Sequence, residues 1–223
     1  TLSLHDALPI SSRLNAAMPR ETVTVFFDYL CPFAWRAAEL SERVAAPLDL
    51  RFEWSHFSLY QANHPSGDGW QLWNQRVDPN DPTGGKGLLA FLASTAARRQ
   101  GAEAFDAFRL GLLRARHRDH RPLDRPTVLD VAADVGLHMA CFERELSDPE
   151  VRTHLAKEHH EAAALHVFGT PTLRFPSGDT AYLRLKQLPE EGALSLELFR
   201  RVRAMLADYP YLETLKRPRH GGN

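Results

Sequence analysis

The sequence has few cysteines, little net charge and no long hydrophobic run. Two cysteines among 223 residues give no basis for a structural disulfide and are typical of a reducing compartment. A net charge of −1 at pH 7 gives no general reason to expect nucleic acid or an anionic membrane as partner. No run approaches the roughly 18 hydrophobic residues of a membrane-spanning helix. We therefore expect a cytoplasmic protein that neither crosses a membrane nor binds nucleic acid.

The rest of the composition is that of an ordinary globular protein. Hydrophobic residues make up 43% of the chain and charged residues 25%, enough for a sizeable core in one domain, or in one domain with a large insertion. Residues 1–17 show neither the basic start nor the continuous hydrophobic run of a secretion signal. We expect them to form a non-native or disordered leader ahead of Met18.

The first elements follow the order strand, helix, strand. Residues 22–29 are β-branched and aromatic, which predicts a buried strand. The alanine-rich stretch 32–46 has a proline in its first turn and ends before Pro47, as a helix does. Residues 48–59 alternate hydrophobic and polar side chains, which predicts a second strand. This order implies a right-handed crossover and a parallel pair of strands.

A long segment rich in Gly, Pro, Asn and Asp then interrupts the α/β pattern. Residues 60–87 are predicted to be a functional loop or a poorly ordered one. An all-helical block follows, with helices expected at 88–100, 102–117, 126–135, 138–146 and 149–166. Ser147 and Glu150 have the spacing of a capping box, which predicts the start of the last of these helices.

The C-terminal part returns to strands and ends in a helix. Two short strands, 172–175 and 180–184, are separated by a proline- and glycine-containing turn, which predicts a hairpin. A helix is expected over 195–209, and the tail beyond it is expected to pack first through Tyr211 and Leu212.

Cys31 is the residue that points most clearly to chemistry. It follows the first predicted strand and precedes Pro32 at the start of the first predicted helix. A helix N-terminus carries partial positive charge and unpaired N–H groups, and both favour a thiolate over a thiol. We therefore interpret Cys31 as a reactive nucleophile rather than as a small buried side chain. Ala34 stands where a redox dithiol has its second cysteine, so the local disulfide of such a site cannot form.

Two segments, FFDYLCPFAW (26–35) and VFGTPT (167–172), together resemble the DsbA-like branch of the thioredoxin superfamily. The resemblance implies an α/β thioredoxin fold, βαβ…ββα, with an all-helical insertion domain. The thioredoxin-like domain would consist of 18–59 and 167–223. Residues 60–166 would form the loop and the helical insertion.

The same resemblance implies where a thiol or an extended substrate would bind. Pro171 would be a cis-proline, and the backbone of Thr170 would pair with the bound molecule. The implied site consists of the nucleophile and its neighbours on two segments: Cys31, Pro32, Phe33, Ala34, Thr170 and Pro171.

The branch also contains kappa-class glutathione transferases, 2-hydroxychromene-2-carboxylate isomerases and mycothiol-dependent reductases. The resemblance therefore implies a thiol oxidoreductase that uses a single cysteine, with a small thiol or disulfide as its partner. Glutathione, bacillithiol or mycothiol would be the co-substrate, with no tightly bound cofactor. Two alternatives remain open: a transferase or isomerase that activates a bound thiol, and a non-catalytic binding protein. A homodimer is a further option.

A candidate pocket follows the second predicted strand. The resemblance implies that His56, Asn63 and His64 lie near the place where related enzymes bind substrate. Trp70 and Trp73, in the long loop, would either cover a hydrophobic pocket or anchor the loop.

Other clusters favour structural interpretations. The arginines of 114–125 are interleaved with Asp119 and Asp124, which favours a solvated helix end over a binding patch. No spacing completes a zinc site around four nearby histidines: His154, His159, His160 and His166. Cys141 shares a helix face with Leu137 and is expected to be buried rather than a redox partner of Cys31.

Overall fold

A four-stranded sheet forms the centre of the thioredoxin-like part of the molecule. The computed structural model describes residues 20–78 and 81–217, so the predicted leader, 1–17, lies outside the described residues. The strands are β1 (Glu21–Phe27), β2 (Leu50–His56), β3 (Thr172–Arg174) and β4 (Thr180–Tyr182). Their order is β2-β1-β3-β4, with β1 parallel to β2 and the other two pairs antiparallel. The parallel pair and the hairpin are confirmed.

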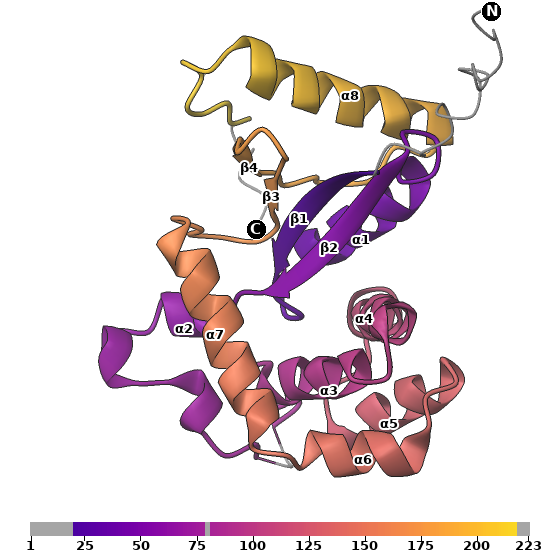
Figure 1. Ribbon diagram of the computed structural model, residues 1–223, viewed down its shortest axis with the longest axis vertical. Helices are drawn as coiled ribbons and strands as arrows, with labels where there is room; N and C mark the ends of the chain where they lie inside the picture. The colour runs from indigo at the N-terminus through magenta and orange to yellow at the C-terminus, as the bar shows by residue number, and fades with distance from the viewer. Residues whose placement is uncertain (1–19, 79–80, 218–223) are drawn as a thin grey trace, which may run out of the picture.

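Helices cover both faces of this sheet (Figure 1). On one face lie α1 (Pro32–Val44) and α8 (Gly192–Asp208), and the ring of Phe199 in α8 packs 5.8 Å from that of Phe52 in β2. On the other face, Phe26 of β1 packs in a small hydrophobic cluster that includes Ala162 of α7. Side chains of β1 and β2 thus pack against helices on opposite faces of the sheet, as the two-residue period of a strand allows.

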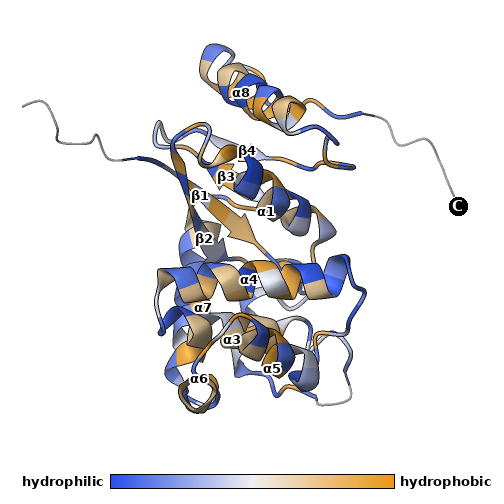
Figure 2. Ribbon diagram, turned by 90° about the vertical axis from the view of Figure 1, so that its right-hand side faces the viewer, coloured by the Kyte–Doolittle hydropathy of each residue, from blue (hydrophilic) through white to orange (hydrophobic). Residues whose placement is uncertain are grey.

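The helical part is inserted between β2 and β3. Its helices are α3 (Leu88–Arg98), α4 (Ala102–His117), α5 (Arg125–Asp134), α6 (Met139–Leu146) and α7 (Glu150–Ala164). Figure 2 shows α3 in the middle, and α4, α5, α6 and α7 all contact it. Every residue from Leu88 to Ala97 is buried, because α3 is surrounded on all sides. The α/β fold with a helical insertion is confirmed.

The long segment before α3 is more ordered than the sequence indicates. It contains the short helix α2 (Leu59–Ala62) and two 3₁₀ turns, Gly67–Gly69 and Leu72–Asn74. Gln61 holds this segment together: its side chain accepts from the N–H of Leu72 at 2.8 Å and donates to the carbonyl of Trp70 at 2.9 Å.

Two local expectations are wrong. Ser147 does not cap α7; it ends α6, and its hydroxyl donates to the carbonyl of Glu143 at 3.0 Å. The N–H of Glu150 is instead satisfied by the carboxylate of Asp148 at 2.9 Å. The tail does not pack through its aromatic residue, since Tyr211 is 80% exposed and Leu212 is 42% exposed. Among the described residues no helix combines the length and hydrophobicity needed to cross a membrane.

Candidate active site

Cys31 caps the N-terminus of α1 in the turn that follows β1. Its N–H donates to the carbonyl of Asp28 at 3.1 Å, and its carbonyl accepts from the N–H of Ala34 at 3.1 Å. Pro32 occupies the first turn of the helix, where the missing N–H has no helical acceptor to lose. The Cys31 side chain therefore lies beside the positive end of the helix dipole, as predicted.

The second wall of the site is the loop before β3. The Thr170–Pro171 peptide bond is cis, and the thiol of Cys31 donates to the carbonyl of Thr170 at 3.2 Å. Pairing of β1 with β3 brings these segments together across 139 residues of sequence. The contact stabilises the protonated thiol, whereas the helix N-terminus stabilises the thiolate. On deprotonation the sulfur loses its hydrogen bond to Thr170 and gains a lone pair for attack.

The predicted site residues differ in how much of their surface solvent reaches. Pro32 is exposed and Phe33 is partly buried, so both can contact a bound molecule. Cys31 itself is 5% exposed and Ala34 has no exposed surface. Cys141 belongs to α6, and Figures 1 and 2 show this helix at the end of the helical domain away from the sheet. Both cysteines are free. Cys141 is only partly buried, contrary to expectation, because α6 presents it beside its exposed N-terminal end.

Asp28 supports the turn that carries Cys31, and sequence reasoning did not single it out. Its carboxylate accepts from the N–H of Leu30 at 2.8 Å and from the N–H of Leu59 at 2.7 Å. It thereby ties the β1–α1 turn to the start of α2. Complete burial raises the pKa of Asp28 to about 6, against the opposing effect of these two hydrogen bonds. The sequence contained one signal that could have identified Asp28: it is a single acidic residue at the end of a hydrophobic strand.

His117 supports the same turn from the helical domain. Its Nε2 lies 2.8 Å from the carbonyl oxygen of Tyr29, and its ring stacks on that of Trp35 with 6.2 Å between centroids. Burial lowers the pKa of His117 to about 4, so the ring is neutral at pH 7. A neutral ring bonded to a carbonyl must carry its proton on Nε2 and donate it. The C-terminal end of α4 thus fixes the backbone just before Cys31.

His56 does not line a pocket, which corrects the expectation for this residue. It has no exposed surface and belongs to a buried polar chain that joins the β1–α1 turn, β2, α3 and α7. The hydroxyl of Tyr29 donates to Ser94 at 2.7 Å, and Ser94 Oγ lies 3.0 Å from His56 Nε2. His56 Nδ1 lies 2.6 Å from Glu158, whose other oxygen accepts from Arg98 at 2.6 Å.

The protonation states of the groups in this buried polar chain follow from their surroundings. Burial lowers the pKa of His56, so its ring is neutral, takes the Ser94 proton at Nε2 and offers its own to Glu158. Burial alone would raise the pKa of Glu158, but His56, His154 and Arg98 hold it well below its usual range. Ser94 has no exposed surface, so this serine–histidine–carboxylate arrangement has no access for a substrate. It is a structural link.

The other four pocket candidates lie around α2 and the 3₁₀ turns. The Asn63 amide donates to the carbonyl of Leu59 at 2.7 Å and closes the end of α2. His64 and Trp70 stack with 4.1 Å between ring centroids. Trp73 is 5% exposed and packs edge-on against His160, with 5.0 Å between centroids. This packing on α7 agrees with the second of the two roles expected for Trp73, that of anchoring the segment.

Most arginines of the stretch 114–125 are engaged with carboxylates. Arg114 holds Glu39 through two hydrogen bonds of 2.7 and 2.9 Å. Arg118, Arg121 and Arg125 pair with Asp119, Asp130 and Glu143. The stretch therefore has little free charge for a ligand. Within the two described ranges, no three metal-ligating side chains gather in a way that could hold a metal ion.

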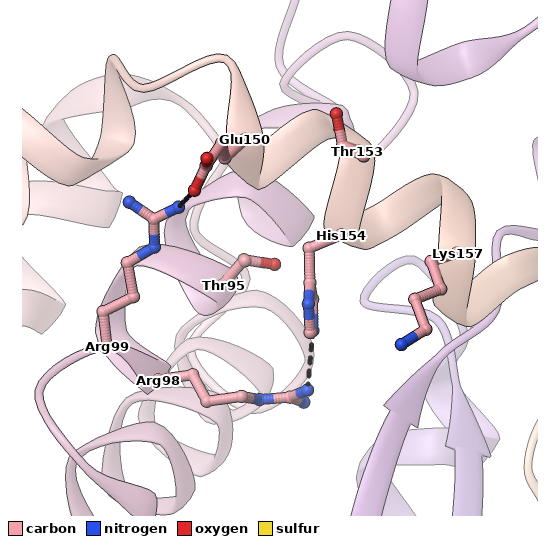
Figure 3. Close-up of a pocket in the computed structure, with 7 residues that line it drawn as sticks. All are labelled: Thr95, Arg98, Arg99, Glu150, Thr153, His154 and Lys157. Atoms are coloured by element: carbon pink, nitrogen blue, oxygen red, sulfur yellow. Dashed lines mark hydrogen bonds and ion pairs between the residues drawn. The ribbon is translucent and has the colours of Figure 1, made fainter.

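A polar pocket between α3 and α7 is also neutralised (Figure 3). Its volume is about 360 Å³, and its lining includes Arg98, Arg99, His154 and Lys157. Arg99 pairs with Glu145, Asp148 and Glu150, and Arg98 with Glu158. None of its seven lining residues belongs to the Cys31 turn or to the cis-proline loop.

Comparisons with known proteins agree with this geometry. The family model described as the DSBA-like thioredoxin domain matches residues 22–191. An uncharacterised protein of Mycobacterium tuberculosis is 26% identical over 199 residues, which cover 89% of this chain and 82% of that protein.

Two solved structures are similar in fold. The cytosolic disulfide reductase DsbM from Pseudomonas aeruginosa, determined with GSH, aligns with a TM-score of 0.53 and 20% identity over 86% of this chain and 100% of that one. A 2-hydroxychromene-2-carboxylate isomerase aligns with a TM-score of 0.57 and 19% identity over 84% of this chain and 98% of that one. At these identities the likeness concerns the fold.

Proposed function

The chain belongs to the family of DsbA-like thioredoxin domains, and within this family we propose a thiol oxidoreductase that works through Cys31 alone. One observation carries the proposal. Among the described residues, Cys31 is the only cysteine beside the cis-proline loop, and its sulfur lies 3.2 Å from the carbonyl oxygen of Thr170. Small-molecule thiols supply what a second cysteine would otherwise supply. The protein acts in the cytoplasm, without a tightly bound cofactor.

The proposed reaction consists of two thiol–disulfide exchanges. The Cys31 thiolate attacks one sulfur of a disulfide; the S–S bond of the substrate breaks, a Cys31–S–S bond forms and the other half leaves as a thiolate. A second small thiol then attacks the mixed disulfide and releases Cys31 as a thiolate. For a substrate that is itself a mixed disulfide with the small thiol, Cys31 takes the small-thiol half and the other half leaves as the reduced substrate. The attacking thiol then leaves joined to that half as the small thiol's own disulfide, so one small thiol is consumed for each substrate thiol released.

Ala34 explains why an external thiol is needed. It lies one turn after Cys31 and is fully buried against the core. A dithiol site would resolve the mixed disulfide with a cysteine at this position, whereas a methyl group cannot attack sulfur. Glutathione, bacillithiol and mycothiol are the candidate co-substrates. The similarity in fold to a reductase determined with GSH supports a thiol of the glutathione type.

The test is to incubate the Cys141→Ser variant with glutathione disulfide and to analyse it by intact mass spectrometry. We expect one mixed disulfide on Cys31, which reduced glutathione then removes. The Cys31→Ser variant, which keeps Cys141, should form no mixed disulfide at residue 31 and should reduce no disulfide substrate. If Cys31 forms no adduct but the protein still binds reduced glutathione, the oxidoreductase proposal is wrong and a non-covalent transferase or isomerase role replaces it.

A further inference from the structure

An aromatic and cationic surface surrounds the Cys31 site. Its residues come from α1, from the loop before β3, and from the end of β4 and the segment after it. We name it the arginine–aromatic cluster: Phe33, Arg36, Phe168, Tyr182 and Arg184. Phe168 is 71% exposed and Tyr182 is 40% exposed, which is unusual for aromatic rings beside a loop that is otherwise buried. Neither arginine was singled out from the sequence, because the segment after β4 meets α1 only in the folded chain.

Contacts within the cluster lead back to the thiol. The guanidinium of Arg184 lies 3.8 Å from the centroid of the Phe33 ring, and that of Arg36 lies 5.4 Å from the same ring. Phe33 is two residues after Cys31 on the first turn of α1. The cationic groups are therefore held at the helix turn that carries the reacting sulfur.

The cluster also touches the second wall of the site. The rings of Phe168 and Tyr182 meet edge to face, with 5.1 Å between centroids. A Cβ on Gly169 would lie 2.9 Å from the Tyr182 ring, so only glycine allows this ring to lie so close to the loop. Gly169 directly precedes Thr170, whose carbonyl accepts from Cys31. The cluster thus borders Cys31 on both the helix side and the loop side.

The two arginines differ from most others in the protein by having no carboxylate partner. Arg98, Arg99 and Arg114 each form ion pairs at 3.1 Å or less. Within residues 20–78 and 81–217, neither Arg36 nor Arg184 forms one; Arg36 makes only a 3.3 Å bond to the carbonyl of Leu185. A guanidinium offers five N–H donors in a fork that matches a carboxylate, so most of this capacity is free.

Building on the proposed function, we propose that the arginine–aromatic cluster makes the Cys31 site selective for small thiols and disulfides that carry carboxylates. Arg36 and Arg184 bind the carboxylate, and the exposed aromatic faces cover the rest of the small molecule. Glutathione and bacillithiol carry carboxylates and are therefore favoured over mycothiol, which has none. The arginines attract the small molecule and orient it, and the Cys31 sulfur performs the thiol–disulfide exchange.

The test compares two aromatic disulfides that release a chromophore. 5,5′-Dithiobis(2-nitrobenzoic acid) carries two carboxylates, whereas 4,4′-dithiodipyridine is uncharged at pH 7.5. Rates of Cys31 modification are measured in a Cys141→Ser background, in the parent and in a double variant, Arg36→Gln with Arg184→Gln. The control, Arg174→Gln with Arg200→Gln, removes the same charge from two other exposed arginines.

We expect the double variant to react about tenfold more slowly with the carboxylate disulfide and at the parent rate with the uncharged one, a typical size for electrostatic attraction at a site. Added salt should slow the carboxylate reaction in the parent but not in the variant. The control should match the parent with both probes. Equal rates in variant and parent, or equal slowing with both probes, overturn the selectivity while the proposed function stands. No labelling of Cys31 by either probe overturns the proposed function itself.

Discussion

Asp28 is a buried carboxylate held at a cost to stability. The increase of its pKa from 3.8 to about 6 on burial corresponds to roughly 3 kcal/mol, at about 1.36 kcal/mol per pKa unit. Because the folded protein holds the Asp28 proton more tightly than the unfolded chain, this contribution lowers stability as pH rises from about 4 to about 6. Above about pH 6 the loss of folding stability has reached its full size and no longer changes with pH.

Asp28→Asn tests this directly, because an amide resembles the protonated acid and has no charge to bury. The amide can accept only one of the two N–H bonds that Asp28 accepts, so the variant should be less stable than the parent near pH 4. Between pH 4 and pH 7 the difference in free energy of unfolding should shift in favour of the variant by up to about 3 kcal/mol. The measurement is urea denaturation across this range. His117 and His159, whose pKa values burial lowers to about 4, act in the opposite sense, so the difference between variant and parent is the informative quantity. A difference that does not change with pH would contradict the prediction.

At the scale of elements, the buried chain from Tyr29 to Arg98 joins strands to helices. Glu158 on α7 contacts His56 on β2 and Arg98 on α3. Arg98 also donates to the carbonyl of Trp54 at 2.9 Å, which attaches α3 to the edge strand β2. A single, largely buried carboxylate therefore satisfies polar groups from two other elements.

Glu158→Leu should lower the free energy of unfolding by about 3 to 5 kcal/mol, because it leaves the charge of Arg98 and the ring of His56 without their partner. Glu161→Leu is the matched control on the same helix, since Glu161 is mostly exposed and, among the residues that the structure describes, pairs with Lys157 alone, at 3.8 Å. That control should change stability by less than about 1 kcal/mol. Thermal or chemical denaturation measures both. Equal losses in the two variants would show that the buried link contributes little.

On the scale of the whole molecule, sheet and helical domain share one hydrophobic core. The main cluster of buried side chains runs from Val25 and Phe27 of β1 through Phe91 of α3 to Phe142 of α6. Arg114 of α4 and Glu39 of α1 add a polar contact across the same boundary. Since neither part buries its hydrophobic side chains alone, we expect them to unfold together.

Urea denaturation should therefore give coincident transitions by two probes. Far-UV circular dichroism reports mainly on the helices, and alkylation of Cys31 in the Cys141→Ser background reports on the thioredoxin-like part. The same midpoint and the same slope are expected for both. Two transitions separated in urea concentration would show that the helical insertion is an independently stable unit.

The sequence determined the local features of this protein. Strand periodicity, the proline in the first turn of α1 and the turn residues before β4 depend on neighbours a few positions away, so they could be predicted. Cys31 at a helix start and the missing sulfur at Ala34 belong to this group. Local signals failed where two interpretations compete, as at Ser147, which ends one helix instead of starting the next.

The tertiary structure decided what depends on contacts between distant segments. The bond from Cys31 to Thr170, the burial of His56 and the meeting of Arg36 with Arg184 around Phe33 join residues from separate elements. No periodicity records such contacts, because each residue satisfies its own element equally well with or without the partner. Strand pairing and the packing of the helical domain against the sheet fix these contacts, and the contacts form the surroundings of the Cys31 thiol.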